Sequence, residues 1–156
     1  MRVSRRSVRG SLWACVIVGA AATTTLSAAA ADAAPRALRV DQVPNVGITV
    51  GPNGISGGFA ANVAATATSA GTTRLGLQPI ADACTGSLRQ ARVGVTWRNE
   101  RTNRTDDAVF PVCAAGKPGP GVEAVTGTGR ISFTTTIIGR TDQAFTVVPG
   151  TGFFFR

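Results

Sequence analysis

Short runs of β-branched and aromatic residues, each ended by glycine or proline, make up most of the chain after residue 45. In the clearest of these runs, Val93, Val95 and Trp97 alternate with polar, charged or small residues. Alternation with a period of two is typical of a strand that is buried on one face. After residue 33, no stretch shows the 3.6-residue apolar period with caps that predicts a helix. The pattern therefore predicts an all-β domain.

The turn sequences predict where the strands begin and end. Residues 51–54 and 69–72 are predicted turns, and residues 100–107 and 116–121 are predicted loops. Many alanines in the run 59–68 also permit a helix there, but glycine and threonine favour a strand. We expect strands over residues 46–50, 59–68, 74–78, 91–99, 108–113, 122–128, 131–138, 144–148 and 152–156. The last of these is expected to be either a covered strand or an apolar edge used for assembly.

About eight short strands separated by turns are typical of an antiparallel β-sandwich. The interval from Cys84 to Trp97 resembles that of immunoglobulin-type domains, in which a tryptophan follows the first cysteine. Cys113 follows too soon to take the usual second position, so the resemblance is to an immunoglobulin-like architecture and not to a family. The alanine-, glycine- and threonine-rich composition is similar to that of small exported β-sandwich proteins of bacteria.

The first 33 residues have the order of a secretory signal peptide. Four arginines within the first nine residues precede an uncharged run of eleven, residues 12–22, and Ala31-Asp32-Ala33 forms an A-x-A site. A membrane-spanning helix needs about 20 apolar residues, so this run is too short for an anchor. We predict cleavage after Ala33 and export of residues 34–156 as one domain, without a transmembrane segment.

Two details of this segment bear on its export and processing. Ser4-Arg5-Arg6 resembles a twin-arginine motif, but Arg9 stands where an apolar residue is usual, which favours the general secretory route. Cys15 lies in front of the apolar run rather than behind it. Lipid attachment at Cys15 would therefore retain the run, so we assign this cysteine to the discarded signal.

Removal of the signal leaves two cysteines, Cys84 and Cys113. In an exported chain, two cysteines most simply form one disulfide. In the chain-entropy model, a crosslink over about 30 residues contributes roughly 3.5 kcal/mol of stability. Two free thiols are the alternative. The chain has no histidine and zinc usually takes about four ligands, so we expect no metal and no cofactor.

The chain lacks residues that most common catalytic sites require, histidine above all. Residues 54–58 match the G-x-S-x-G pattern of serine hydrolases, but the chain contains no histidine to act as the base. The only lysine of a possible serine–lysine pair, Lys117, falls in the glycine- and proline-rich loop 116–121. Paired carboxylates remain possible for glycoside hydrolysis. The acids after residue 33 are Asp41, Asp82, Glu100, Asp106, Asp107, Glu123 and Asp142.

Positive charge is the main remaining signal. After residue 33, eleven arginines and one lysine face seven acids, which gives +5, against +8 for the whole chain. The arginines gather around one predicted hairpin, where Arg92 and Arg98 share the face opposite Trp97 and Arg101 and Arg104 lie at the tip. Guanidinium groups bind carboxylates and phosphates in a two-pronged manner. A solvated polar face, balanced by Glu100, Asp106 and Asp107, is the alternative.

These observations favour a non-enzymatic binding or structural module of the cell envelope or the secreted fraction. We predict contact with an anionic polymer or protein through Arg92, Arg98, Arg101 and Arg104, or self-association through Phe153, Phe154 and Phe155. A nucleic-acid partner is not expected, because no aromatic residues interleave with the arginines. A small carboxylate-based hydrolase and a protease inhibitor that presents the loop 116–121 are the alternatives.

Overall fold

The computed structural model describes residues 34–80, 82–139 and 143–156, so the predicted signal peptide lies outside the described residues. The described residues form β-strands and no helix, which confirms the all-β prediction. Among these residues there is accordingly no helix long and apolar enough to cross a membrane. The strands are β1 (Arg36–Leu38), β2 (Val40–Val43), β3 (Asn45–Gly51), β4 (Gly54–Ser69), β5 (Thr72–Pro79), β6 (Arg92–Asn99), β7 (Thr105–Pro111), β8 (Cys113–Ala114), β9 (Lys117–Pro118), β10 (Val122–Val125), β11 (Arg130–Ile138), β12 (Gln143–Val148) and β13 (Gly150–Phe155).

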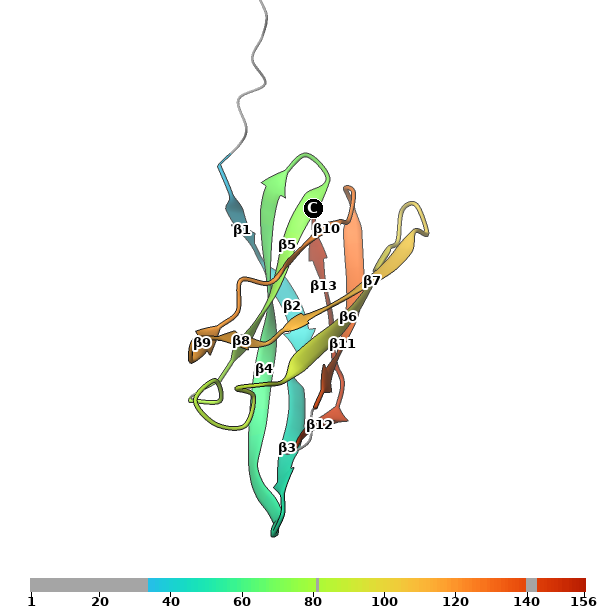
Figure 1. Ribbon diagram of the computed structural model, residues 1–156. Coiled ribbons are helices and arrows are strands. Elements are labelled where there is room, and N and C mark those ends of the chain that lie inside the picture. The colour runs from blue at the N-terminus through green and yellow to red at the C-terminus, as the bar shows by residue number, and fades with distance from the viewer. Residues whose placement is uncertain (1–33, 81, 140–142) are drawn as a thin grey trace, which may run out of the picture. The chain divides into compact units, whose positions relative to one another are not determined.

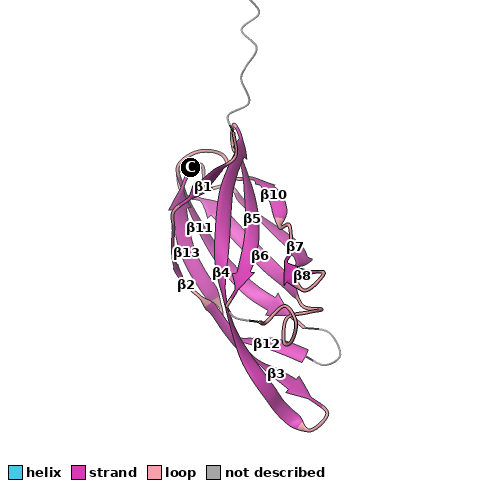
Figure 2. Cartoon of the chain, turned by 90° about the vertical axis from the view of Figure 1, so that its left-hand side faces the viewer, coloured by secondary structure: helices cyan, strands magenta, loops and turns pink. Residues whose placement is uncertain are grey.

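Two antiparallel sheets carry almost all of these strands (Figure 1). Sheet A has the order β10-β5-β4-β3-β12, with β1 paired to β4 as well, and sheet B has the order β2-β13-β11-β6-β7. The two-residue strands β8 and β9 form a small ladder of their own. In sheet A, β5 pairs with β4 only from Ala61 onward, so the β3–β4 hairpin extends past the end of β5 (Figure 2).

The inner faces of the two sheets share one hydrophobic core. Alternate residues of β4 from Phe59 to Ala67 are buried, and the residues between them are partly exposed. In sheet B, Val93, Val95 and Trp97 are buried while Arg92 and Arg98 are exposed. The first alternation confirms a strand over residues 59–68, and the second confirms the predicted faces of the strand over residues 91–99. Burial of the apolar faces of two sheets against each other is the main stabilising contribution expected for such a fold.

Four strands, β1, β2, β8 and β9, were not predicted from the sequence. β1 and β2 lie in a segment with four charged or amide side chains, Arg36, Arg39, Asp41 and Gln42, in which only Leu38 and Val40 mark an inner face. β8 and β9 are two residues long, too short to leave a periodic signal. The predicted loop 116–121 is therefore partly wrong, because Lys117 and Pro118 pair with Ala114 and Cys113.

One loop boundary and one strand face also differ from expectation. The loop predicted over residues 100–107 ends earlier, since β7 begins at Thr105 and pairs with Arg98. In β3, Asn45 and Gly47 are the buried positions, whereas Val46, Ile48 and Val50 are partly exposed. The Phe59 ring lies so close to Gly47 that a Cβ there would sit 2.3 Å from its tip. The ring of β4 thus covers the space that a side chain on β3 would otherwise fill.

The predicted disulfide is confirmed. Cys84 and Cys113 are bonded, with their Cα atoms 5.5 Å apart, and both residues are buried. The bond ties the turns of residues 82–90 to β8, just beyond the end of β7. It therefore fixes a segment that forms turns and no strand and that packs Leu88 into the core.

Buried asparagines join the two sheets. The Asn99 side chain at the end of β6 donates to the carbonyls of Thr126 and Thr128, at 2.8 and 3.1 Å, and accepts from the amides of Arg101 and Thr102. Residue 99 is only 2% exposed. One side chain therefore satisfies backbone groups of both the β6–β7 turn and the β10–β11 connection, groups that would be costly to leave unpaired.

A second buried asparagine lies in β3. Asn45 donates to the Thr135 carbonyl at 2.9 Å and accepts from the Thr146 hydroxyl at 3.1 Å. The Thr146 hydroxyl oxygen in turn accepts from the Ile137 amide at 2.6 Å. Strands β3 and β12 of sheet A are thereby bonded to β11 of sheet B, so these polar contacts reinforce the apolar packing at a second place.

Asn99→Ala is expected to destabilise the protein by about 2–4 kcal/mol, because several partly or fully buried backbone groups lose their partner at once. Asn53→Ala, in the exposed turn before β4, should stay within about 0.5 kcal/mol of the wild type. Denaturant unfolding of the three proteins provides the measurement. Equal stabilities of the two variants would show that the Asn99 bonds do not hold the sheets together.

Gly121→Ala should also destabilise strongly, by about 2 kcal/mol or more. Gly121 has a φ of +75°, and a Cβ there would lie 2.3 Å from the Leu75 carbonyl oxygen. Gly57→Ala is the matched control, because an added Cβ at Gly57 meets nothing within 4 Å. Thermal unfolding should show a clear drop in Tm for the first variant alone, and similar melting of both would contradict this packing.

Candidate functional site

The outer face of sheet B carries some of the residues that the sequence marks as functional, namely Arg92, Arg98, Phe153 and Phe155. Strand pairing aligns Asp41 with Phe153, Phe153 with Ser132, and Ser132 with Arg98. Because paired residues of antiparallel strands point to the same side, these side chains form one row across β2, β13, β11 and β6. Neighbouring strands lie about 4.8 Å apart, so the row spans roughly 14 Å.

The structure does not bring the four predicted arginines together. Arg92 and Arg98 occupy the same face of β6, but six residues separate them, a distance of roughly 20 Å along a strand. The Arg92 guanidinium donates to the Val109 carbonyl at 3.1 Å. With Arg89, Arg92 lines a separate shallow hollow of about 340 Å³ beside Cys113.

Arg98, Arg101 and Arg104 lie at the other end of sheet B, around the β6–β7 turn. Arg98 donates to the Asn103 side chain at 2.7 Å, and Arg101 donates to the Thr128 hydroxyl at 2.6 Å. All three are exposed. Within residues 34–80, 82–139 and 143–156, the ion pairs join Arg74 to Glu123 and Arg130 to Glu100. None of the three tip arginines therefore has a carboxylate partner in this part of the chain.

The three consecutive phenylalanines lie on β13, which pairs with β11 on one side and with β2 on the other. The covered-strand alternative is therefore correct, and β13 is not an edge. Phe154 is fully buried in the core, Phe153 is partly exposed, and Phe155 is 64% exposed. The two outward rings contact each other edge to face, with centroids 5.8 Å apart.

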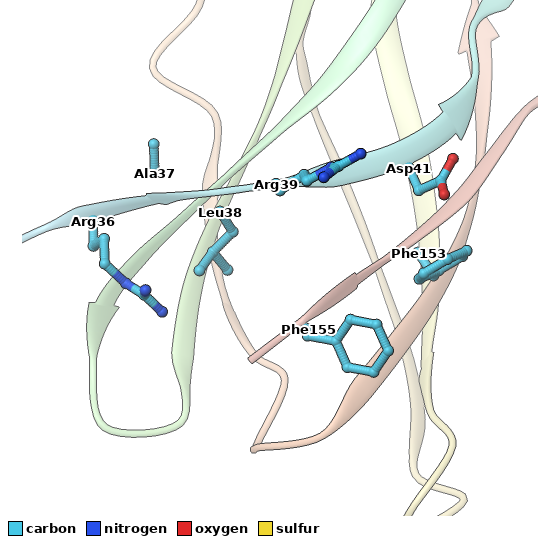
Figure 3. Close-up of a pocket in the computed structure, with 7 residues that line it drawn as sticks. All are labelled: Arg36, Ala37, Leu38, Arg39, Asp41, Phe153 and Phe155. Carbon is cyan, nitrogen blue, oxygen red and sulfur yellow. The ribbon is translucent and has the colours of Figure 1, made fainter.

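A hollow of about 490 Å³ lies beside these two rings. The segment of β1 and β2 forms its other wall, with Arg36, Ala37, Leu38, Arg39 and Asp41 (Figure 3). Arg36 and Leu38 project to the side on which the rings lie, whereas Ala37 points the opposite way (Figure 3). The hollow combines apolar surface with charges of both signs.

Arg130 holds the Phe153 ring from the side of β11. Its guanidinium carbon lies 4.0 Å from the ring centroid, a cation–π contact. The same guanidinium forms an ion pair with Glu100 through contacts of 2.9 and 3.2 Å. The Glu100 carboxylate is thus engaged with Arg130. It does not balance the charge of the tip arginines, which was the alternative expected from the sequence.

The acidic residues show no paired arrangement in the described part of the chain. Asp142 lies outside the described residues, and the other six acids are exposed. Glu100 and Glu123 form the two ion pairs with arginine. Asp106 and Asp107 are neighbours on β7 and therefore point to opposite faces, and within the described ranges no group of three acids or cysteines could hold a metal ion.

Ser56, the serine of the G-x-S-x-G match, lies near the start of β4 in an exposed hairpin. Its hydroxyl donates to the Thr49 carbonyl at 3.2 Å. A strand follows this serine, not the helix that the hydrolase motif requires. Lys117 is exposed on β9. The described geometry therefore gives neither residue a catalytic surrounding.

Sequence reasoning missed Arg36, Arg39 and Asp41, which line the hollow, and Arg130, which stacks on Phe153. The first three lie in the segment whose strands were not predicted, although the spacing of Leu38 and Val40 carried a weak alternation signal. Arg130 follows a glycine between two predicted strands, and only strand pairing reveals that it lies beside Phe153 and Phe155.

The chain matches no family model, no curated protein and no solved structure in the comparisons made.

Proposed function

We propose that the protein is an exported, non-enzymatic binding module of the cell envelope or the secreted fraction, with an immunoglobulin-like β-sandwich architecture. Two antiparallel sheets around one core and a buried disulfide support this architecture. The sequence features of residues 1–33 support export.

One observation carries the binding proposal. Arg98, Arg101 and Arg104 surround one exposed turn, and their described side-chain hydrogen bonds go to neutral oxygens of this protein. An exposed guanidinium without a carboxylate partner keeps its capacity for two-pronged contact with an anion. The contact would be made with carboxylates or phosphates of an envelope polymer or with an acidic protein.

The two alternatives receive less support. A carboxylate-based hydrolase requires two acids that face each other across a cleft, at about 5–9.5 Å, whereas the described acids are exposed and two of them pair with arginine. A protease inhibitor requires a protruding loop at residues 116–121. Gly119 donates to the Val112 carbonyl at 2.8 Å, and Gly121 packs against Leu75, so part of this loop lies against the domain.

Charge reversal at the hairpin tip tests the proposal. The triple variant Arg98→Glu, Arg101→Glu, Arg104→Glu should lose about tenfold or more of the binding to purified anionic envelope polymer at low salt. The control Arg89→Glu, Arg92→Glu, Lys117→Glu changes the net charge equally, at exposed residues away from the tip, and should retain most of the binding. Raising the salt concentration should weaken wild-type binding steeply.

Binding is measured by co-sedimentation with the polymer, and circular dichroism verifies that each variant is folded. Tip reversal that leaves binding untouched would exclude this turn as the contact. Equal loss in the two triple variants would reduce the interaction to an effect of net charge.

A further inference from the structure

We propose that the hollow between β13 and the β1–β2 segment binds a ligand in which an anionic group is joined to an apolar one. A carboxylate or phosphate on an acyl chain has this chemistry. The site lies outside the hairpin tip and involves none of its arginines, so it goes beyond the proposed function and can be tested separately.

The apolar half of the site consists of the two outward rings and Leu38. Phe155 is 64% exposed and stands edge to face against Phe153. Leu38 packs against the core and presents part of its side chain to the hollow. Exposed aromatic surface in a concave setting is unfavourable in water, and an acyl chain that covers the rings would gain roughly 25 cal/mol for each Å² of apolar area removed from water.

The cationic half, which would bind the anionic group of the ligand, consists of Arg36 and Arg39. Both are exposed and line the hollow from the β1–β2 segment. The ion pairs within the described ranges involve Arg74 and Arg130 instead, so neither Arg36 nor Arg39 is neutralised there by a carboxylate. A bound carboxylate or phosphate would supply that missing partner through charge-assisted hydrogen bonds.

Asp41 gives the site a direction. Its residue pairs with Phe153, at the far end of the hollow from Arg36 (Figure 3). The carboxylate repels an anion at that end, which leaves the Arg36 end as the place for the head group and the rings for the chain. The same arginines disfavour a quaternary ammonium ligand, although phenylalanine rings can bind such cations.

The rings are held in place before any ligand arrives. Phe154 anchors β13 in the core, and Arg130 stacks on Phe153 while it is itself paired with Glu100. Preformed side chains lower the entropy cost of binding. The hollow of about 490 Å³ also falls within the range of roughly 300–1,000 Å³ that is usual for small-molecule sites.

Isothermal titration of the purified protein with dodecyl phosphate, below its micelle concentration, tests the proposal. We expect saturable binding of one molecule, weakened roughly tenfold by Arg36→Glu and by Phe155→Ala. Each variant has a matched control: Arg92→Glu reverses the charge of another exposed arginine, on β6, and Phe145→Ala removes another exposed phenylalanine, on β12. Both controls should bind within about twofold of the wild type.

Three further probes separate the parts of the ligand and its source. Dodecyl maltoside has the chain without the charge and inorganic phosphate has the charge without the chain, so neither should saturate the site. Phosphatidylglycerol vesicles show whether a lipid head group in a bilayer is accepted, or only a free amphiphile. Absence of saturable dodecyl phosphate binding would overturn the proposal, and so would equal losses in Arg36→Glu and Arg92→Glu, or in Phe155→Ala and Phe145→Ala.

Discussion

The structure depends on the attachment of two antiparallel sheets to each other through one shared core and two buried asparagines. The core supplies the non-directional stabilisation, because apolar side chains of both sheets remove each other from water. Asn45 and Asn99 supply the directional part, since their amides hydrogen-bond to groups that belong to elements far apart in the sequence. Packing alone permits sliding between sheets, whereas a buried amide with both its donor and its acceptor engaged fixes one arrangement.

This attachment also positions the exposed arginines of the β6–β7 turn and the outward phenylalanines of β13. Asn99 fixes the β6–β7 turn, from which Arg98, Arg101 and Arg104 project. On the other side of sheet B, burial of Phe154 sets the rotation of β13 and thereby turns Phe153 and Phe155 outward, because successive side chains of a strand point to opposite faces. The hairpin tip and the hollow beside Phe153 and Phe155 are therefore held on the same two-sheet framework. The proposed contact at the tip relies on charge alone, and the one proposed for the hollow combines charge with apolar surface.

The amino-acid pattern predicts the strands wherever one face is strictly apolar, as in Val93, Val95 and Trp97. It also predicts the disulfide, because only two cysteines, Cys84 and Cys113, follow residue 33. It fails where burial is polar or where the strand is short. Asn45 is buried because it forms hydrogen bonds to other strands, which the apolar periodicity of the sequence does not predict. The pattern does not predict β1 and β2, because they are rich in charged residues. It therefore does not predict the wall that they form beside Phe153 and Phe155. Contacts between distant residues, such as Arg130 over Phe153, follow only from strand order.

Hydrogen exchange of the asparagine side chains, measured by NMR, tests the joined-sheet arrangement most directly. The Asn99 amide protons should exchange slowly, in the same class as the backbone amides of β6 and β11, because exposing them requires the β10–β11 connection to separate from the end of β6. The Asn53 amide protons, in an exposed turn, should exchange at the rate of an unstructured peptide. Exchange at Asn99 as fast as at Asn53 would contradict the arrangement, since the side chain would then be in contact with water and not with the two connections it is inferred to hold.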